Sequence, residues 1–78
     1  MPRPINNNTE KIYCVEYRLR EGEPLLRYIC KAVDPREAEK RTVKAFGRNI
    51  SIYGRPRVMS RSTASAALLL YSGFAGEL

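Results

Sequence analysis

Apolar and polar side chains alternate along residues 11–20 with the two-residue period of a half-buried β-strand. Residues 25–33 make a second predicted strand, and residues 21–24 between them contain the glycine and the proline of a turn. A turn centred on Gly22 and Glu23 places the alternating apolar residues on one face. Its apolar cross-strand pairs are Leu19 with Leu26, Tyr17 with Tyr28, Val15 with Cys30 and Tyr13 with Ala32. The pattern therefore predicts a β-hairpin with one apolar face and one polar face.

The two cysteines lie on opposite faces of this predicted hairpin. Cys30 points toward the core, whereas Cys14 lies on the polar face. The other residues expected on the polar face are Glu16, Arg18, Arg20, Arg27, Ile29 and Lys31. Two sulfurs on opposite faces of a sheet cannot reach the geometry of a disulfide. We therefore expect two free thiols, which is consistent with a reducing, cytoplasmic location.

Residues 34–46 carry the start and stop signals of an α-helix. Asp34 is in the N-cap position, Pro35 is in the first helical position, and Glu37 follows the cap by three residues, which completes a capping box. Gly47 comes directly after the last turn, where glycine commonly ends a helix. The helix face expected to cover the hairpin consists of Ala38, Thr42, Ala45 and, as its main anchor, Phe46.

A third strand is predicted at residues 49–53, with Ile50 and Ile52 pointing inward. It can continue to residue 59 past Pro56, which cannot donate a hydrogen bond to a ladder and so marks an edge, a bulge or a turn. The hairpin, the helix and this strand give an α+β fold of order ββαβ with an antiparallel sheet.

A short C-terminal helix completes the predicted fold. Ser60 or Ser62 can cap it, and it runs through Tyr71. Residues 64–71 are apolar nearly all round, so another surface must bury them. The helix either packs on the open face of its own sheet or forms an interface, with a second copy or with a partner, through residues 64–71. Both alternatives stay open.

The chain divides into an arm and one domain. Residues 1–10 contain two prolines and three consecutive asparagines, and they are expected to form a flexible N-terminal arm. Residues 11–78 are expected to form a single small α+β domain with a thin core.

Lysine and arginine outnumber aspartate and glutamate by 14 to 8, which gives a net charge of +6. Eight of these 14 basic residues lie within residues 34–61, on the helix and on the strand after it. Such a surface attracts nucleic acid, a nucleoprotein complex or an acidic protein patch. Nucleic-acid binding typically combines basic residues with an exposed aromatic ring, although a solvated helix face explains any one of these residues taken singly. The candidate partner-binding residues are Arg36, Lys40, Lys44, Arg48, Tyr53, Arg55 and Arg57.

Catalytic chemistry has little support in this sequence. The chain has no histidine, so neither the cysteines nor the serines have the usual general base. We find no set of four metal ligands, no convergent pair of carboxylates and no glycine-rich phosphate loop. We therefore expect a protein that is not an enzyme, with no cofactor and no metal. Its longest apolar stretch is far shorter than the ~20 residues that span a bilayer, so we expect no membrane partner.

The order of elements resembles that of several small phage-encoded anti-CRISPR proteins. This resemblance is one of topology and covers residues 11–59. The helix start that carries it is Ala32-Val33-Asp34-Pro35-Arg36-Glu37-Ala38-Glu39-Lys40. It implies a single-domain binder without catalytic residues, which blocks a surveillance complex on its nucleic-acid-recognition surface or on its subunits. Many members of that group are acidic DNA mimics, whereas this chain is basic, which favours contact with an acidic or RNA-bearing surface.

The same order of elements also resembles a small ribosomal protein of the archaeal large subunit. That family is richer in lysine after the helix, where this chain has Ile50-Ser51-Ile52-Tyr53. Three functions follow as hypotheses. The first is a non-catalytic binding protein, an inhibitor from a phage or mobile element that docks on a nucleoprotein complex in the host cytoplasm. The second is a direct RNA- or DNA-binding module, and the third is a small structural subunit of a larger assembly.

Overall fold

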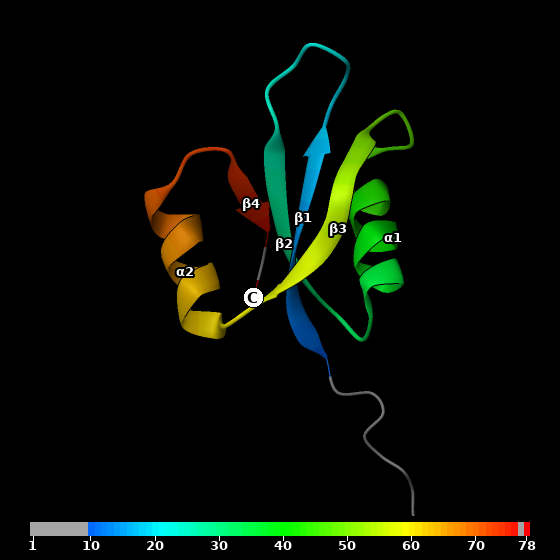
Figure 1. Ribbon diagram of the computed structural model, residues 1–78. Coiled ribbons are helices and arrows are strands. Elements are labelled where there is room, and N and C mark those ends of the chain that lie inside the picture. The colour runs from blue at the N-terminus through cyan, green and yellow to red at the C-terminus, as the bar shows by residue number, and fades with distance from the viewer. Residues whose placement is uncertain (1–9, 77) are drawn as a thin grey trace, which may run out of the picture.

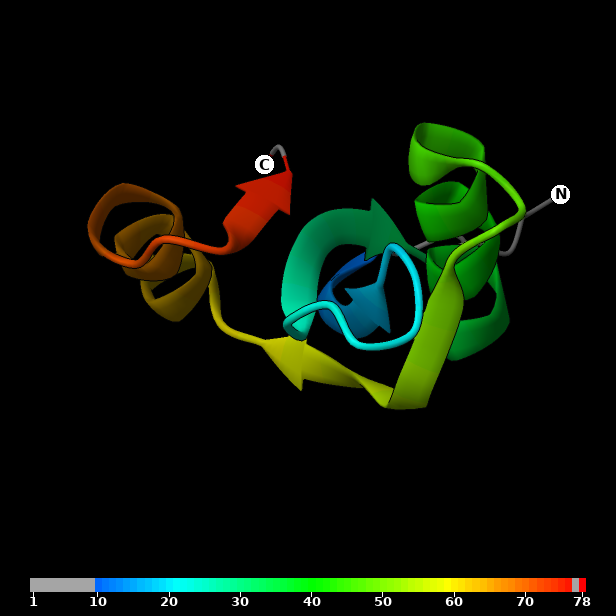
Figure 2. The same cartoon turned by 90° about the horizontal axis from the view of Figure 1, so that it is seen from above.

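The computed structural model of the protein describes residues 10–76 and residue 78 (Figure 1). These residues form a four-stranded sheet, and the view from above shows its two helices on opposite sides (Figure 2). In chain order the elements are β1 (Lys11–Arg18), β2 (Leu26–Ala32), α1 (Pro35–Phe46), β3 (Ser51–Met59), α2 (Arg61–Leu70) and β4 (Phe74–Gly76). The strands lie side by side in the order β3-β1-β2-β4, so β3 and β4 are the edges of the sheet.

Side chains of the central strand β1 alternate between the two faces of the sheet. We call the face covered by α1 the α1 face and the opposite one the α2 face. On the α1 face β1 places Tyr13, Val15 and Tyr17, all of them buried. On the α2 face β1 places Ile12, Cys14, Glu16 and Arg18, all of them half-buried. The predicted strand alternation is therefore confirmed, but both of its faces contribute to packing.

The α+β class predicted from the sequence is confirmed, but the sheet is mixed and not antiparallel. The additional strand is β4, which pairs in parallel with β2. Gly76 permits this pairing because a β-carbon at its position would overlap the backbone carbonyl of Ile29, and because its φ of 141° suits glycine alone. A strand of three residues is too short to show an alternation, which is why the sequence pattern did not predict it.

The β1–β2 hairpin has the predicted faces but a different register. Tyr13 pairs with Cys30 and Val15 pairs with Tyr28, so every pair is shifted by two residues from the prediction. The turn is closed by a hydrogen bond from the Glu23 amide to the Arg20 carbonyl oxygen, at 3.1 Å. Its centre is therefore one residue earlier than predicted. A shift of two residues keeps each side chain on its own face, so the apolar pattern does not distinguish the two registers.

The predicted separation of the cysteines is confirmed. Cys30 is buried in the cluster under α1, while Cys14 packs on the α2 face, and both thiols are free. Leu19 departs from the prediction, because it lies beyond the end of β1 with 45% of its surface exposed and does not pair with Leu26.

The start of α1 forms as its sequence predicts. The Asp34 carboxylate accepts a hydrogen bond from the Glu37 amide at 2.8 Å. The Glu37 carboxylate reaches back to the amide of Val33, also at 2.8 Å, one residue before the position that a standard capping box uses. Gly47 ends the helix with a φ of 99°.

The buried face of α1 agrees with the prediction except at one residue. Ala38 and Thr42 are fully buried. Ala45 is exposed, because it lies at the flank of the buried arc beside an open cavity.

Phe46 anchors the end of α1 to the sheet, as predicted. Its ring stacks on Tyr17 with 4.5 Å between centroids and meets Tyr28 edge-on at 5.1 Å. Both arrangements are favourable for aromatic quadrupoles, so this contact fixes the helix across β1 and β2.

β3 is one strand that begins later and runs further than residues 49–53. Ile52 pairs with Tyr17 on the α1 face, but Ile50 lies before the strand. The register against β1 shifts at Val15, so that residues 54–56 form a bulge. Gly54 allows the bulge with a φ of 69°, and Pro56 is tolerated because β3 is an edge strand.

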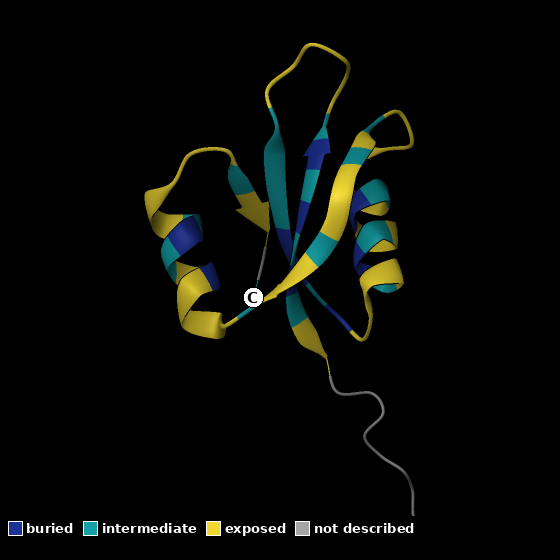
Figure 3. Ribbon diagram, in the orientation of Figure 1, coloured by how far each residue is buried: buried dark blue, intermediate teal, exposed yellow. Residues whose placement is uncertain are grey.

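α2 packs in part on its own sheet, which answers one of the two alternatives left by the sequence. Ala64 and Ala67 are buried against Ile29 on the α2 face. The C-terminal end of α2 remains exposed (Figure 3). We define the α2 tip as Leu69, Leu70 and Tyr71, which are 83%, 73% and 61% exposed.

The predicted arm of residues 1–10 lies outside the described part of the chain except for Glu10, whose carboxylate is 3.6 Å from the Arg41 guanidinium. Neither of the two described helices has the length and apolarity to cross a membrane.

Replacing Asp34 by alanine is expected to lower the free energy of unfolding by about 1 kcal/mol, because the amide of Glu37 loses its acceptor. Asp34→Asn is the matched control, since asparagine caps nearly as well and should retain most of the stability. Urea unfolding followed by circular dichroism measures both variants. Equal losses in the two variants would contradict a capping role.

Candidate nucleic-acid interface

Four residues, one from each strand, form a row across the α2 face. The ladders pair Tyr53 with Glu16, Glu16 with Arg27, and Arg27 with Phe74. The row lies nearer the β1–β2 turn than the residues that α2 covers, and Tyr53 is 57% exposed. Together with Arg18 these four residues make up what we call the sheet platform.

Each aromatic ring of the sheet platform has an arginine beside it. The Arg18 guanidinium lies 5.8 Å from the centre of the Tyr53 ring, and the Arg27 guanidinium lies 5.4 Å from the centre of the Phe74 ring. Arg27 also donates to the Glu16 carboxylate at 3.2 Å. Arg18 has no ion pair within residues 10–76, and its buried Nε has no hydrogen-bond partner there. Its charge is therefore available to an external anion.

A hollow of about 310 Å³ opens on the α2 face beside this row. Its lining consists of Cys14, Glu16, Arg27, Arg55, Arg57, Val58, Met59 and Phe74. Three arginines face one carboxylate in this set, and Glu16 is already paired with Arg27. The platform hollow, as we name it, is therefore a basic cavity with an apolar wall.

A second hollow, the edge hollow, lies around the free edge of β3 and has a volume of about 360 Å³. Its lining consists of Asp34, Pro35, Arg36, Glu39, Arg55 and Pro56. Arg55 belongs to both hollows, because the bulge at residues 54–56 projects from the edge strand between them. Arg36, Arg55 and Arg57 thus follow one another from the start of α1 to the α2 face.

These three arginines form no ion pair with a described residue. In the part of the chain that the structure describes, the ion pairs join Arg27 to Glu16 and Arg41 to Glu10 and Glu37. None of them involves Arg36, Arg55 or Arg57.

The structure brings together only part of the predicted partner-binding set. Tyr53, Arg55 and Arg57 lie on β3, and Arg36 joins them at the edge hollow. Lys40 lies beside Arg36 in a neighbouring surface depression.

Two of the predicted residues lie elsewhere. Lys44 lines a cavity on the other flank of α1, and Arg48 lies in the turn after this helix. Lys44 lies apart from Arg36 for a geometric reason, because a step of four residues overshoots one helical turn by about 40°. The two such steps from Arg36 through Lys40 to Lys44 therefore add up to about 80° around the helix, and Arg36 and Lys44 face different sides.

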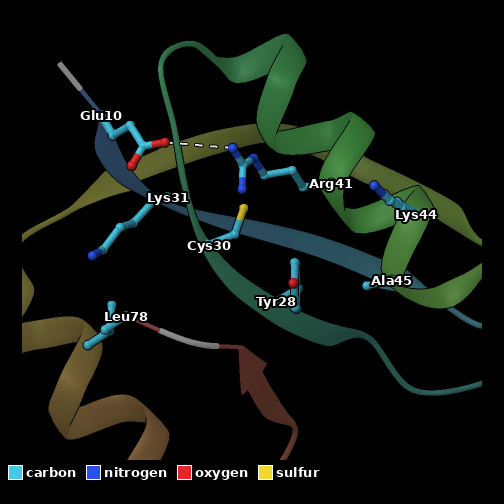
Figure 4. A pocket seen from close by; sticks show the side chains of 8 residues that line it. All are labelled: Glu10, Tyr28, Cys30, Lys31, Arg41, Lys44, Ala45 and Leu78. Carbon is cyan, nitrogen blue, oxygen red and sulfur yellow. Dashed lines mark ion pairs between the residues drawn. The ribbon is translucent and has the colours of Figure 1, made fainter. Parts of the chain in front are cut away.

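The cavity that Lys44 lines has a volume of about 360 Å³ and contains two further cations (Figure 4). Arg41 is directed toward Glu10, with which it forms an ion pair, and Lys31 points away from both (Figure 4). Because Arg41 also pairs with Glu37, at 3.8 Å, part of the charge here is neutralised within the fold. Lys31 and Lys44 form no ion pair in the described part of the chain, so this cavity also keeps unpaired positive charge.

Sequence analysis missed Arg18, Arg27 and Phe74 as site residues. The alternation did place both arginines on the polar face of the hairpin, but it gave no reason to separate them from ordinary solvated charges. Phe74 lies on β4, which was not predicted. An arginine paired with an aromatic ring on a neighbouring strand is the signal that could have identified them. That signal can be read only once the strand register is known.

Both thiols are poor nucleophiles at neutral pH. Burial raises the pKa of the Cys14 thiol above its ordinary value, even though Arg27 and Arg57 act in the opposite direction. Burial likewise raises the pKa of the Cys30 thiol. Among the described residues no three His, Cys, Asp or Glu side chains are grouped so that they could hold a metal ion.

Comparison of the chain with protein-family models, with curated proteins and with solved structures finds no match. The resemblances to anti-CRISPR proteins and to a ribosomal protein therefore stay hypotheses. The function must be argued from the surface itself.

Stability is expected to fall as the pH rises above 9.0, the ordinary pKa of the two thiols. In the unfolded chain the thiols lose their protons at that value, whereas in the folded chain their raised pKa keeps them protonated longer. The thiols therefore contribute stability that is complete below this pH and is lost above it. Urea unfolding in the presence of a reductant, at neutral pH and at about pH 10, measures the loss. Cys30→Ala should show a smaller loss than the wild type, and an unchanged loss would contradict this account.

Proposed function

We propose that this protein is a non-catalytic nucleic-acid-binding module that binds a phosphate backbone with the arginines around the edge of β3. The observation that carries the proposal is the succession of Arg36, Arg55 and Arg57 along two adjoining hollows, without an ion pair in the described part of the chain. The net charge of +6 supports it, because a positive field accelerates the approach of a polyanion.

Arginine suits this task better than lysine would. Its planar guanidinium stays charged and donates two parallel hydrogen bonds to a phosphate. Of the acidic residues in the two hollows, Asp34 caps α1 and Glu16 pairs with Arg27. The carboxylates of Asp34 and Glu39 still balance the two arginines of the edge hollow, so the excess of positive charge lies in the platform hollow.

The shape of β3 favours a ligand other than another β-strand. An exposed edge usually invites strand pairing. Here the bulge interrupts the edge, and Pro56 has no amide hydrogen to offer to a neighbouring strand. The edge is therefore better suited to side-chain contacts with a ligand than to backbone pairing.

Replacing both Arg55 and Arg57 by glutamine is expected to weaken binding of RNA and DNA oligonucleotides and to lower the salt dependence of that binding. Two lost phosphate contacts should reduce the slope of log K against log salt by about 1.5. Fluorescence anisotropy over a salt titration measures both quantities.

The control for this variant is the charge-matched pair Lys11→Gln and Lys44→Gln, whose side chains lie away from the two hollows. The control should keep most of the wild-type slope. If the two double variants lose the same amount, net charge alone accounts for the binding and the proposed site is wrong.

A second candidate function is docking on the protein component of a nucleoprotein complex, as the inhibitor hypothesis requires. The observation that favours it is the α2 tip, where three adjacent apolar side chains are largely exposed. Clusters of this kind on a small protein commonly mark a protein contact.

Changing Leu69 and Leu70 to serine is expected to leave the affinity for oligonucleotides unchanged. The same change should abolish the part of the binding to a nucleoprotein complex that remains after nuclease treatment. Leu19→Ser is the control, because Leu19 is also an exposed leucine but lies in the β1–β2 turn. Affinity capture from a host lysate, with and without nuclease, compares the three proteins. Capture that disappears with nuclease in every case argues for nucleic-acid binding alone.

A further inference from the structure

We infer that the nucleic acid bound by this protein is single-stranded and that one of its bases stacks on Tyr53 of the sheet platform. This inference rests on the proposed function and specifies the class of its ligand. It concerns the sheet platform, whereas the phosphate contacts proposed above concern the two hollows.

Tyr53 has the placement of a stacking residue. The residue is 57% exposed although its backbone is held in the β1–β3 ladder opposite Glu16. The guanidinium of Arg18 lies beside the ring, which limits the ring's freedom before a ligand arrives. An ordered and exposed aromatic ring on a sheet loses little conformational entropy when a base stacks on it.

The surroundings of Tyr53 supply the backbone contacts that a stacked base needs. Arg55 and Arg57 follow it on the same strand and line the platform hollow. On the other side the uncompensated Arg18 presents a further charge. A nucleotide whose base lies on Tyr53 would therefore have cations on both sides for its neighbouring phosphates.

A second aromatic ring lies at the far end of the same row. Tyr53 is on β3 and Phe74 is on β4, the two outermost strands. Since neighbouring strands lie roughly 4.8 Å apart, the backbones of Tyr53 and Phe74 are separated by about 14 Å. The Glu16–Arg27 pair lies between them, so the sheet platform offers two apolar rings connected by a polar strip.

Strand separation is what allows a base to use this surface. In a duplex the bases are stacked on each other and only the phosphates and groove edges face outward. In a single strand the bases can turn out and stack on protein rings, each adding binding energy with little dependence on sequence. A sheet surface with exposed rings and flanking arginines thus favours single strands.

The test measures binding of single-stranded RNA, single-stranded DNA and a DNA duplex of equal length by anisotropy. We expect both single strands to bind more tightly than the duplex. Tyr53→Thr, which removes the ring but keeps a residue favourable in strands, should weaken single-strand binding about tenfold or more. Tyr53→Phe should restore the affinity, because it keeps the ring.

Because Tyr53 is uncharged, the salt slope should stay at its wild-type value in Tyr53→Thr, unlike in the Arg55 and Arg57 variant. Leu19→Thr is the control for loss of an exposed apolar side chain and should bind like the wild type, because Leu19 is exposed and lies in the β1–β2 turn. Circular dichroism checks that each variant is folded.

The outcomes separate the two levels of the proposal. If no oligonucleotide binds, the proposed function and this inference both fail. If nucleic acid binds through Arg55 and Arg57 but the duplex binds as well as single strands, or Tyr53→Thr matches the Leu19→Thr control, only the stacking inference is overturned. Single-strand preference that depends on the ring supports it, and the RNA and DNA arms show which sugar is preferred.

Discussion

The change of polarity along one side of β1 is the constraint on which the rest of the structure depends. The residues of β1 on the α2 face change from apolar to charged toward the turn, in the order Ile12, Cys14, Glu16 and Arg18. β2 has the same change from Ile29 to Arg27. α2 can therefore bury its alanines only over the apolar half, since covering unpaired charges is costly. The uncovered half is the sheet platform.

The edge strand β3 adds a second constraint, because its arginines, Arg55 and Arg57, form no ion pair with the described acidic residues. The bulge at residues 54–56 leaves Arg55 without a cross-strand partner on β1. Like charges that lie close together without compensation disfavour the compact state. Salt screens this repulsion at exposed sites, and a bound polyanion would remove it. The same feature that weakens the fold slightly would thus favour the phosphate binding that we propose.

Much of the fold could be predicted from the sequence where local chemistry decides. The cap by Asp34 and Glu37 involves residues three apart, and the faces of the hairpin follow from a two-residue period. The hairpin register depended on the centre of the turn, for which the alternation gives no information. β4 depended on the approach of Gly76 to Ile29, which joins residues far apart in the chain.

The candidate site divides in the same way. Arg55, Arg57 and Tyr53 were predicted because they cluster in the sequence. Their neighbours Arg18 and Arg27 could not be chosen without the ladder that brings them there. Lys44 is exposed and basic as expected, but it lies on another flank of α1, away from the two hollows.

The sheet platform and the α2 tip are continuous, so the two candidate functions do not exclude each other. The Tyr71 ring of the tip lies 5.9 Å from Phe74, whose ring in turn lies beside Arg27. The basic surface therefore meets the apolar one at Phe74, which contacts Arg27 on one side and Tyr71 on the other. Free nucleic acid gains little from exposed leucines, whereas arginines without an ion pair suit any partner that presents anions. A partner that presents both an exposed single strand and an apolar protein surface would use the whole of this side of the molecule.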